Sequence, residues 1–306
     1  MRSKLILATR GSPLALVQAN FVKSEVMARW PGLEVTLLPI KTTGDRILDK
    51  PLRSEGGKGL FVKEIEEALK KGEADFAVHS VKDMPSILPE GLKLGVVLKR
   101  EDPADVLVSE KFLSLAALPK GARVGTASLR RKIQLLKLRP DLSVLDLRGN
   151  VETRIKRMRE GRFEAVVLAL AGLKRLGRER DAREVLPFVA APGQGALGLE
   201  YSASDVELEK LLAVLNDPET ETCIKAERII QKNLEGSCEL PLGAHGVLEE
   251  GKLRLKAFLS DAEGQLYLED EVVGDPTLSQ DLGEKLSEIL LARGGRTILE
   301  DVRKKR

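Results

Sequence analysis

Aromatic residues, cysteine and histidine are scarce in this 306-residue chain, and each shortage excludes a class of function. Aromatics make up 3% of the residues, which leaves few side chains for bases to stack on and argues against single-stranded nucleic-acid binding. The two cysteines, Cys223 and Cys238, and the two histidines, His79 and His245, form no metal-binding pattern, so we expect no metal site. So few cysteines also predict a reducing, cytoplasmic location.

Long apolar runs are also absent. No stretch of the sequence approaches the roughly 20 apolar residues that cross a bilayer, so we expect no membrane association. With 42% hydrophobic and 32% charged residues, the chain has the composition of a soluble globular protein. Its length suffices for two or three domains.

Positive charge is unevenly distributed along the chain. The net charge is only +3, but residues 121–160 contain 11 basic and 4 acidic side chains. Such a local excess of positive charge favours an anionic partner.

The stretch from Ala77 to Pro85 is the most informative part of the sequence. Phe76-Ala77-Val78 has the pattern of a buried strand, and the following polar residues end at a proline, which disfavours helix at the residue before it. We therefore expect Lys82 and Asp83 on a loop at the end of a strand, where ligands of α/β sheets bind. The alternative is an ordinary surface Lys–Asp pair.

A second candidate anion site lies near the N-terminus. Lys4 to Ala8 predict a buried strand, and the helix from Leu14 to about Trp30 has Ser12 as a plausible N-cap and Pro13 at its first position. Free backbone N–H groups at this helix start, together with Arg10, would attract an anion.

Arginines follow three predicted strands in the middle of the chain. These strands, at Arg123–Ala127, Val144–Leu147 and Ala165–Ala169, lead into helices, two of which begin after Ser128 and Asn150. Because the arginine fork suits carboxylates and phosphates, we expect ligand contacts from Arg130, Arg131, Arg148 and Arg154. The alternative, a solvated basic helix face, fits Lys156, Arg157 and Arg159.

Two glycine-containing loops differ in their expected roles. The polar segment 41–58 contains glycines but lacks the spacing of a nucleotide-binding P-loop, so we interpret it as a mobile lid. The candidate lid residues are Gly57, Lys58 and Phe61, which follows the segment.

Cys223 lies within a predicted helix and is expected to be buried. Cys238 lies in a glycine-rich loop past a helix C-terminus, where the helix dipole does not activate a thiolate. A single permanent modification suits Cys238 better than repeated turnover.

The order of predicted elements indicates an α/β protein with three domains. Residues 1–98 and 193–215 form domain 1, because a strand after Gly193-Gln194-Gly195-Ala196 could return to the first sheet. Residues 99–192 form the arginine-rich domain 2. Residues 216–306 form a small α+β domain 3 with a hairpin and terminal helices.

Seven short motifs, taken together, resemble the hydroxymethylbilane synthase family, also called porphobilinogen deaminases. They occur in family order across nearly the whole chain, at Ala8–Leu16, Gly56–Phe61, His79–Pro85, Gly125–Arg131, Leu147–Arg154, Gly193–Ala196 and Glu235–Gly243. The resemblance implies two lobes like those of type II periplasmic binding proteins and a small α+β C-terminal domain. It also implies a dipyrromethane cofactor joined by a thioether to Cys238, with Asp83 as the catalytic residue.

The same resemblance assigns the remaining site residues. The cofactor would be bound by Lys82, Thr126, Ser128, Arg130, Arg131 and Arg154, and the substrate by Arg10, Ser12, Arg148 and Gln194. The implied reaction joins four porphobilinogen molecules on the cofactor and releases a linear tetrapyrrole, which passes to uroporphyrinogen-III synthase. The protein would be a cytoplasmic monomer without a metal or nucleic-acid partner. The alternatives are a non-catalytic two-lobed protein that binds small anions, and an RNA-binding protein that uses residues 121–160.

Overall fold

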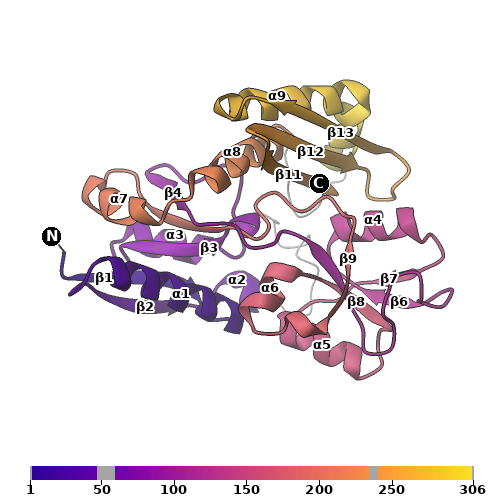
Figure 1. Ribbon diagram of the computed structural model, residues 1–306, viewed down its shortest axis with the longest axis horizontal. Coiled ribbons are helices and arrows are strands. Elements are labelled where there is room, and N and C mark those ends of the chain that lie inside the picture. The colour runs from indigo at the N-terminus through magenta and orange to yellow at the C-terminus, as the bar shows by residue number, and fades with distance from the viewer. Residues whose placement is uncertain (1, 47–58, 235–239, 305–306) are drawn as a thin grey trace. The chain divides into compact units, whose positions relative to one another are not determined.

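The computed structural model describes residues 2–46, 59–234 and 240–304 (Figure 1). The chain forms two compact units, the first comprising Met1–Glu101 and Ala196–Glu221, and the second Asp102–Gly195 and Thr222–Arg306. Within the described ranges, no helix is both long enough and apolar enough to cross a membrane.

The first unit is built on a five-stranded mixed sheet in the order β2-β1-β3-β10-β4. Its strands are β1 (Lys4–Arg10), β2 (Glu34–Ile40), β3 (Phe76–Ser80), β4 (Leu92–Val97) and β10 (Leu197–Ser202). The first three are parallel, and β10 lies antiparallel between β3 and β4. The prediction that a late strand returns to the first sheet is thus confirmed.

Helices cover both faces of this sheet. Helices α1 (Pro13–Arg29) and α7 (Val206–Leu212) share one apolar core with it, and α3 (Lys63–Lys70) belongs to the core on the other face. The loop predicted over residues 41–58 contains a short helix, α2 (Thr43–Arg46), so that part of the prediction was wrong. Asp45 accepts hydrogen bonds from the Thr42 backbone and hydroxyl and stabilises this turn, which the general polarity of the segment concealed.

The second unit contains a five-stranded sheet in the order β7-β6-β8-β5-β9. The strands are β5 (Asp105–Val108), β6 (Arg123–Gly125), β7 (Ser143–Leu145), β8 (Ala165–Ala169) and β9 (Ala182–Leu186). Strands β6, β7 and β8 are parallel, and β5 lies antiparallel between β8 and β9. The plan therefore repeats that of the first sheet. Strands β5 and β9 were not predicted.

Two helices that follow strands β6 and β7 of this sheet begin at the predicted caps. Ser128 caps α4 (Leu129–Leu138), and Asn150 caps α5 (Val151–Arg159), each through a hydrogen bond from a backbone N–H three residues later. Helix α6 (Leu170–Arg175) follows β8 directly. The caps bring the segments with Arg130 and Arg154 to the carboxyl ends of the parallel strands.

The C-terminal part of the chain forms a three-stranded antiparallel sheet of β11 (Leu242–Glu249), β12 (Lys252–Ser260) and β13 (Tyr267–Gly274). The β12–β13 hairpin was predicted, whereas β11 was not. Apolar side chains from α8 (Pro218–Asn233), α9 (Ser279–Leu290) and α10 (Arg296–Lys304) pack in one core with this sheet. Cys223 is buried there, as predicted. The predicted class, two similar α/β lobes and a small α+β C-terminal domain, is confirmed.

Candidate functional site

The Asp83 segment is a single helical turn rather than an irregular loop. Strand β3 ends at Ser80, and Val81–Asp83 form a 3₁₀ turn that the Met84 N–H closes onto the Val81 carbonyl. Val81 and Met84 are 1% and 2% exposed, whereas Asp83 between them is exposed. Two buried anchors therefore hold the turn and leave the Asp83 carboxylate accessible.

Asp83 lies at a cavity of the first unit, together with three other predicted site residues. The cavity is formed by the end of β1, the start of α1, the end of β3 and the segment before α3. The predicted residues at its wall are Arg10, Ser12, Phe61 and Asp83. The Ser12 hydroxyl accepts a hydrogen bond from the Ala15 N–H, so the predicted N-cap of α1 is confirmed.

Arg10 contacts two side chains, Asp45 and Phe61, and the sequence predicted neither contact. Its guanidinium pairs with Asp45 and lies 4.3 Å from the centroid of the Phe61 ring. Burial alone would raise the pKa of Asp45, but the hydrogen bond and charge of Arg10 lower it below its usual value. Asp45 therefore stays ionised, and a ligand carboxylate at Arg10 would compete with it.

Gln18 is a polar cavity residue that the sequence analysis missed. It lies on α1, is 5% exposed, and its amide and the Ser80 hydroxyl are 3.0 Å apart. A glutamine within the apolar sequence of this helix was the available signal.

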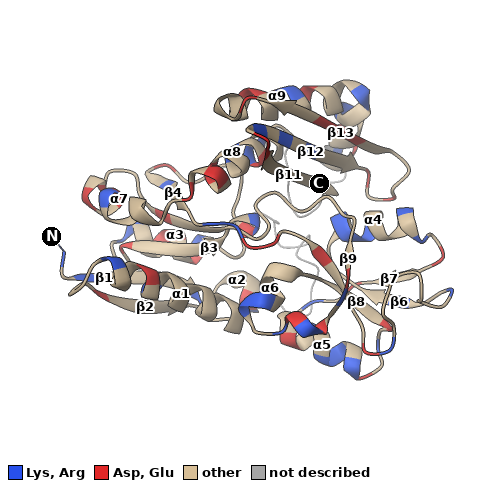
Figure 2. Ribbon diagram, in the orientation of Figure 1, with Lys and Arg blue, Asp and Glu red and all other residues tan. Residues whose placement is uncertain are grey.

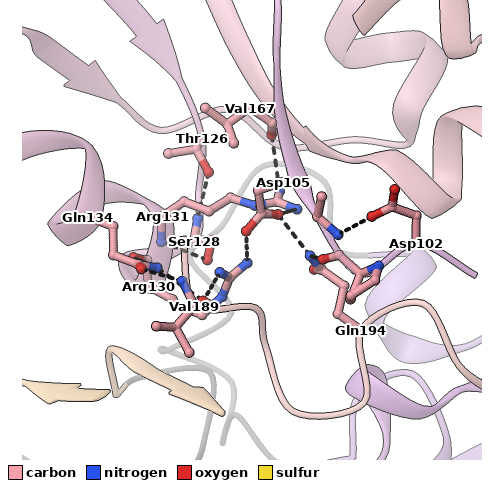
Figure 3. Close-up of polar contacts among 12 residues, drawn as sticks. Asp102, Asp105, Thr126, Ser128, Arg130, Arg131, Gln134, Val167, Val189 and Gln194 are labelled. Carbon is pink, nitrogen blue, oxygen red and sulfur yellow. Dashed lines mark hydrogen bonds and ion pairs between the residues drawn. The ribbon is translucent and has the colours of Figure 1, made fainter. Parts of the chain in front are cut away.

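In the second unit, Arg130 and Arg131 surround one buried carboxylate, Asp105 (Figure 3). Arg130 Nη2 lies 2.7 Å from Asp105 Oδ2, and Arg131 Nη2 lies 2.7 Å from Oδ1. The arginines also donate to backbone carbonyls, Arg130 to Val189 (2.7 Å) and Arg131 to Val167 (3.1 Å). Both are at most 6% exposed, so these forks are fixed by the protein before any ligand binds.

Asp105 reaches this place because β5 runs opposite to its neighbours. As the first residue of β5 it lies beside Ala169, the last residue of β8, and hence at the carboxyl ends of the parallel strands. Burial alone would raise the pKa of Asp105, but Arg130 and Arg131 lower it well below its usual range. Two guanidinium groups share this single carboxylate, so the cluster keeps an excess of one positive charge. Sequence reasoning missed Asp105 because β5 was not recognised.

Gln194 also contacts Asp105. Its amide nitrogen donates to Asp105 Oδ1 (3.0 Å) and to the Pro103 carbonyl (2.6 Å), and the residue is 1% exposed. The structure thus places Gln194 beside the arginine cluster, in a positioning contact that the sequence did not predict.

Thr126 and Ser128 form the turn that starts α4. The Thr126 hydroxyl accepts from the Ser128 N–H (3.2 Å), and the Ser128 hydroxyl accepts from the Arg131 N–H (3.4 Å). The turn fixes the helix start, and with it the positions of Arg130 and Arg131.

Arg148 and Arg154 belong to the next strand–helix connection. Arg154 Nε donates to the Gly149 carbonyl (2.7 Å), and Gly149 has φ of 110°, a conformation that favours glycine. Basic residues continue along α5 (Figure 2). There Arg159 is exposed and pairs with Glu110 at 2.7 Å, as a solvated helix face would.

Three predicted site residues fall outside the residues that the structure describes, namely Cys238, Gly57 and Lys58. Lys82 is described and lies half-buried in the Val81–Asp83 turn. Across the described ranges, no group of three potential metal-ligating side chains is found. The roles assigned to the site residues stay predictions.

Fold and site together define a two-lobed α/β protein with arginine side chains at its strand ends. Residues 5–210 match the family model "Porphobilinogen deaminase, dipyromethane cofactor binding domain", and residues 221–292 match "Porphobilinogen deaminase, C-terminal domain". The chain is 50% identical to the porphobilinogen deaminase of Pelobacter propionicus, over 98% of this chain and 97% of that one. It is 47% identical to that of Syntrophobacter fumaroxidans, over 97% of each. The chain therefore belongs to the porphobilinogen deaminase family, and the predicted family is confirmed.

Two solved structures show a weaker similarity to part of the chain. A periplasmic substrate-binding protein of an ABC transporter from Coxiella burnetii matches with a TM-score of 0.46 and 16% identity, over 70% of this chain and 92% of that one. A nutrient-binding protein from Burkholderia cenocepacia, bound to methionine, matches with a TM-score of 0.45 and 16% identity, over 76% of this chain and 97% of that one.

Proposed function

We propose that this protein is a transferase that catalyses the hydroxymethylbilane synthase reaction. It deaminates four porphobilinogen molecules, joins them head to tail on a covalent dipyrromethane primer, and releases the linear tetrapyrrole hydroxymethylbilane by hydrolysis. The observation that carries this proposal is the nearly full-length match to porphobilinogen deaminases, with Asp83 exposed at a cavity that Arg10 also lines.

The arginine cluster of the second unit fits a cofactor that bears carboxylates. Dipyrromethane carries acetate and propionate groups, and the Arg130–Arg131–Asp105 cluster has an excess of one positive charge at the start of α4. A carboxylate there would gain charge-assisted hydrogen bonds and the favourable end of the helix dipole. We assign cofactor binding to this cluster with Thr126, Ser128, Lys82 and Arg154, and covalent attachment to Cys238.

Asp83 would act on the substrate in two ways. When porphobilinogen loses ammonia, its methylene carbon becomes positively charged, and the Asp83 carboxylate stabilises that charge. After the new carbon–carbon bond forms, the same carboxylate accepts the proton that leaves the pyrrole α-carbon. The primer, when bound, supplies the nucleophilic α-carbon of its terminal pyrrole.

The other assignments concern substrate, partners and location. We assign the substrate carboxylates to Arg10, Ser12, Arg148 and Gln194, and a lid role to Gly57, Lys58 and Phe61. The product would pass to uroporphyrinogen-III synthase. The enzyme would act as a cytoplasmic monomer, and the division into domains 1–98 with 193–215, 99–192 and 216–306 is part of the proposal.

Intact mass tests the attachment site. Protein made in a haem-synthesising cell should be heavier than its sequence mass by two linked pyrroles, and peptide mapping should place the addition on Cys238. Cys223 is 6% exposed within a helix and should stay unmodified.

The matched control is Cys223→Ala, which should keep the added mass, whereas Cys238→Ala should lose it. Unmodified wild-type protein, or an addition mapped to Cys223, would refute the attachment and favour a non-catalytic anion-binding protein.

Replacing single arginines with leucine should separate cofactor binding from substrate binding. Arg130→Leu and Arg131→Leu remove fixed donors of the buried cluster and should yield mostly unloaded, less stable protein, because a bound group stabilises the state that binds it. Arg10→Leu and Arg148→Leu should keep Cys238 loaded but raise KM or stall elongation. Mass spectra and steady-state kinetics of the four variants provide the measurement.

Arg159→Leu is the control for this series. Arg159 is an exposed arginine that pairs with Glu110 on the surface, so its loss should change neither loading nor KM. If all four site variants carry intact cofactor and differ only in KM, the division between cofactor and substrate arginines is wrong.

A further inference from the structure

Three ionisable side chains to which no role has been assigned above are buried together in the first unit. They are Glu66 on α3, His79 on β3 and Glu200 on β10, with exposed fractions of 8%, 5% and 0%. His79 Nε2 lies 2.9 Å from Glu200 Oε2. Among the described residues, Glu66 Oε1, both Glu200 oxygens and His79 Nε2 meet no hydrogen-bond partner, so the short contact between His79 and Glu200 is not a hydrogen bond. Buried carboxylates without donors are rare and costly, so this cluster requires an explanation.

Strand register explains why the three side chains meet. Gly198 lies opposite His79, and Glu200 lies opposite Ala77, so His79 and Glu200 point to the same face of the sheet. Ala77 packs on that face against Ile65 of α3, the residue next to Glu66. The face covered by α3 therefore contains two carboxylates and one imidazole.

Charge within the cluster does not balance if both carboxylates are ionised. One imidazole, in whichever form, cannot neutralise two buried carboxylates. Burial, followed by the charge of Glu200, raises the pKa of Glu66 to about 7, against smaller opposing effects of His79 and of the exposed Lys70. Glu66 therefore carries a proton in mildly acidic solution and loses it near neutrality.

The cluster is connected to the cavity at both ends. His79 belongs to the cavity wall and lies one residue before Ser80, where β3 passes into the Asp83 turn. Phe61 and Val62 of the same wall directly precede α3, which carries Glu66. When Glu66 loses its proton, its repulsion from Glu200 acts on α3, and thus on the Phe61–Val62 segment of the cavity wall that directly precedes it.

We propose that Glu66, His79 and Glu200 form a buried proton-sharing cluster that positions the Asp83 turn and makes turnover depend on the protonation of Glu66. The residues act through the turn and through Phe61, so they are positioning residues. This proposal rests on the proposed synthase function for its kinetic consequence, but not for its titration.

Glu66→Gln tests the kinetic consequence, because glutamine keeps the shape of the side chain and cannot ionise. In the wild-type holoenzyme, kcat should fall about 2- to 30-fold as the pH rises through neutrality, the range expected for coupling through packed elements. The variant should not show this step. Glu67→Gln, on the exposed side of the same helix, is the matched control and should keep the wild-type profile. A Glu66→Gln profile that overlays the wild type would overturn the proposal.

Two measurements on the folded protein do not depend on activity. The infrared band of a protonated carboxylic acid should be present in mildly acidic solution, disappear above neutrality, and be absent from Glu66→Gln. The chain has only two histidines, so the His79 ring signals can be assigned with His245→Gln and should shift as Glu66 titrates. If both the infrared band and the shift of the His79 signals are absent, the proposed cluster is overturned. A folded protein with both signals but no synthase activity would refute the proposed function instead.

Stability should follow the same titration. Folding raises the pKa of Glu66, so the protonated side chain favours the folded state. This contribution to the free energy of unfolding is fully present when the pH is below the pKa of Glu66 in the unfolded chain, and it is lost as the pH rises through about 7. Glu66→Gln should therefore have a higher Tm than the wild type in alkaline solution, and the difference should shrink in acid. A Tm difference independent of pH would contradict this.

Discussion

Asp83→Asn is expected to lower kcat about 10²- to 10⁴-fold, the typical loss when a positioned proton-transfer group is removed. The amide has nearly the same shape, so the Val81–Asp83 turn, held by the buried Val81 and Met84, should form as before. It can neither oppose the positive charge that develops on the substrate nor accept the proton. Single-turnover kinetics with porphobilinogen would measure the loss.

Two controls separate catalysis from folding and loading. Intact mass shows whether the variant carries its cofactor, and Asp83→Glu keeps the charge on a longer side chain and should retain more activity than Asp83→Asn. Near-wild-type kcat in folded, loaded Asp83→Asn protein would show that another residue performs this role.

Asp105→Asn is expected to reduce the free energy of unfolding by about 3–5 kcal/mol, as does breaking a buried ion pair by removing one partner. It would leave the guanidinium groups of the buried Arg130 and Arg131 without a counter-charge. Urea unfolding of the two proteins would measure the difference. Cofactor loading should also fall, because Asp105 holds both forks in place.

Asp102→Asn is the matched control for Asp105→Asn. Asp102 lies three residues earlier, its side chain is 39% exposed, and asparagine can still accept the hydrogen bond from the Ala104 N–H. It should cost little stability. Equal stability of the two variants would mean that Asp105 does not compensate the arginines.

The destabilisation should also depend on pH in a defined direction. Folding lowers the pKa of Asp105, so the ionised carboxylate favours the folded state. This contribution to the free energy of unfolding is present when the pH is above the pKa of Asp105 in the unfolded chain, and it is lost as the pH falls through the pKa in the folded protein. The difference between wild type and Asp105→Asn should therefore persist at neutral pH and narrow only in strong acid.

Local signals in the sequence predicted the parts of the site that depend on nearby residues. Ser12, Ser128 and Asn150 were recognised as N-caps because a cap bonds to a backbone N–H only two or three positions away. The end of β3 before Asp83 was recognised in the same way, from a buried run followed by polar residues and Pro85. Such features need no knowledge of the rest of the fold.

The partners of these residues depended on tertiary structure. Asp105 meets Arg130 and Arg131 because β5 runs antiparallel beside β8, and Glu66 meets His79 and Glu200 because α3 packs on two strands. Asp45 likewise reaches Arg10 through a short helix that the polarity of its segment concealed.

The sequence by itself determined the family, the α/β class, the helix starts and the residues that carry charge to the strand ends. Tertiary structure alone decided which charges are neutralised and which are left in excess. The physical reason is that caps and strand ends arise from contacts between near neighbours in the chain. The pairing of Arg130, Arg131 and Asp105, or of Glu66 and Glu200, instead depends on strand order and burial, which no local pattern encodes.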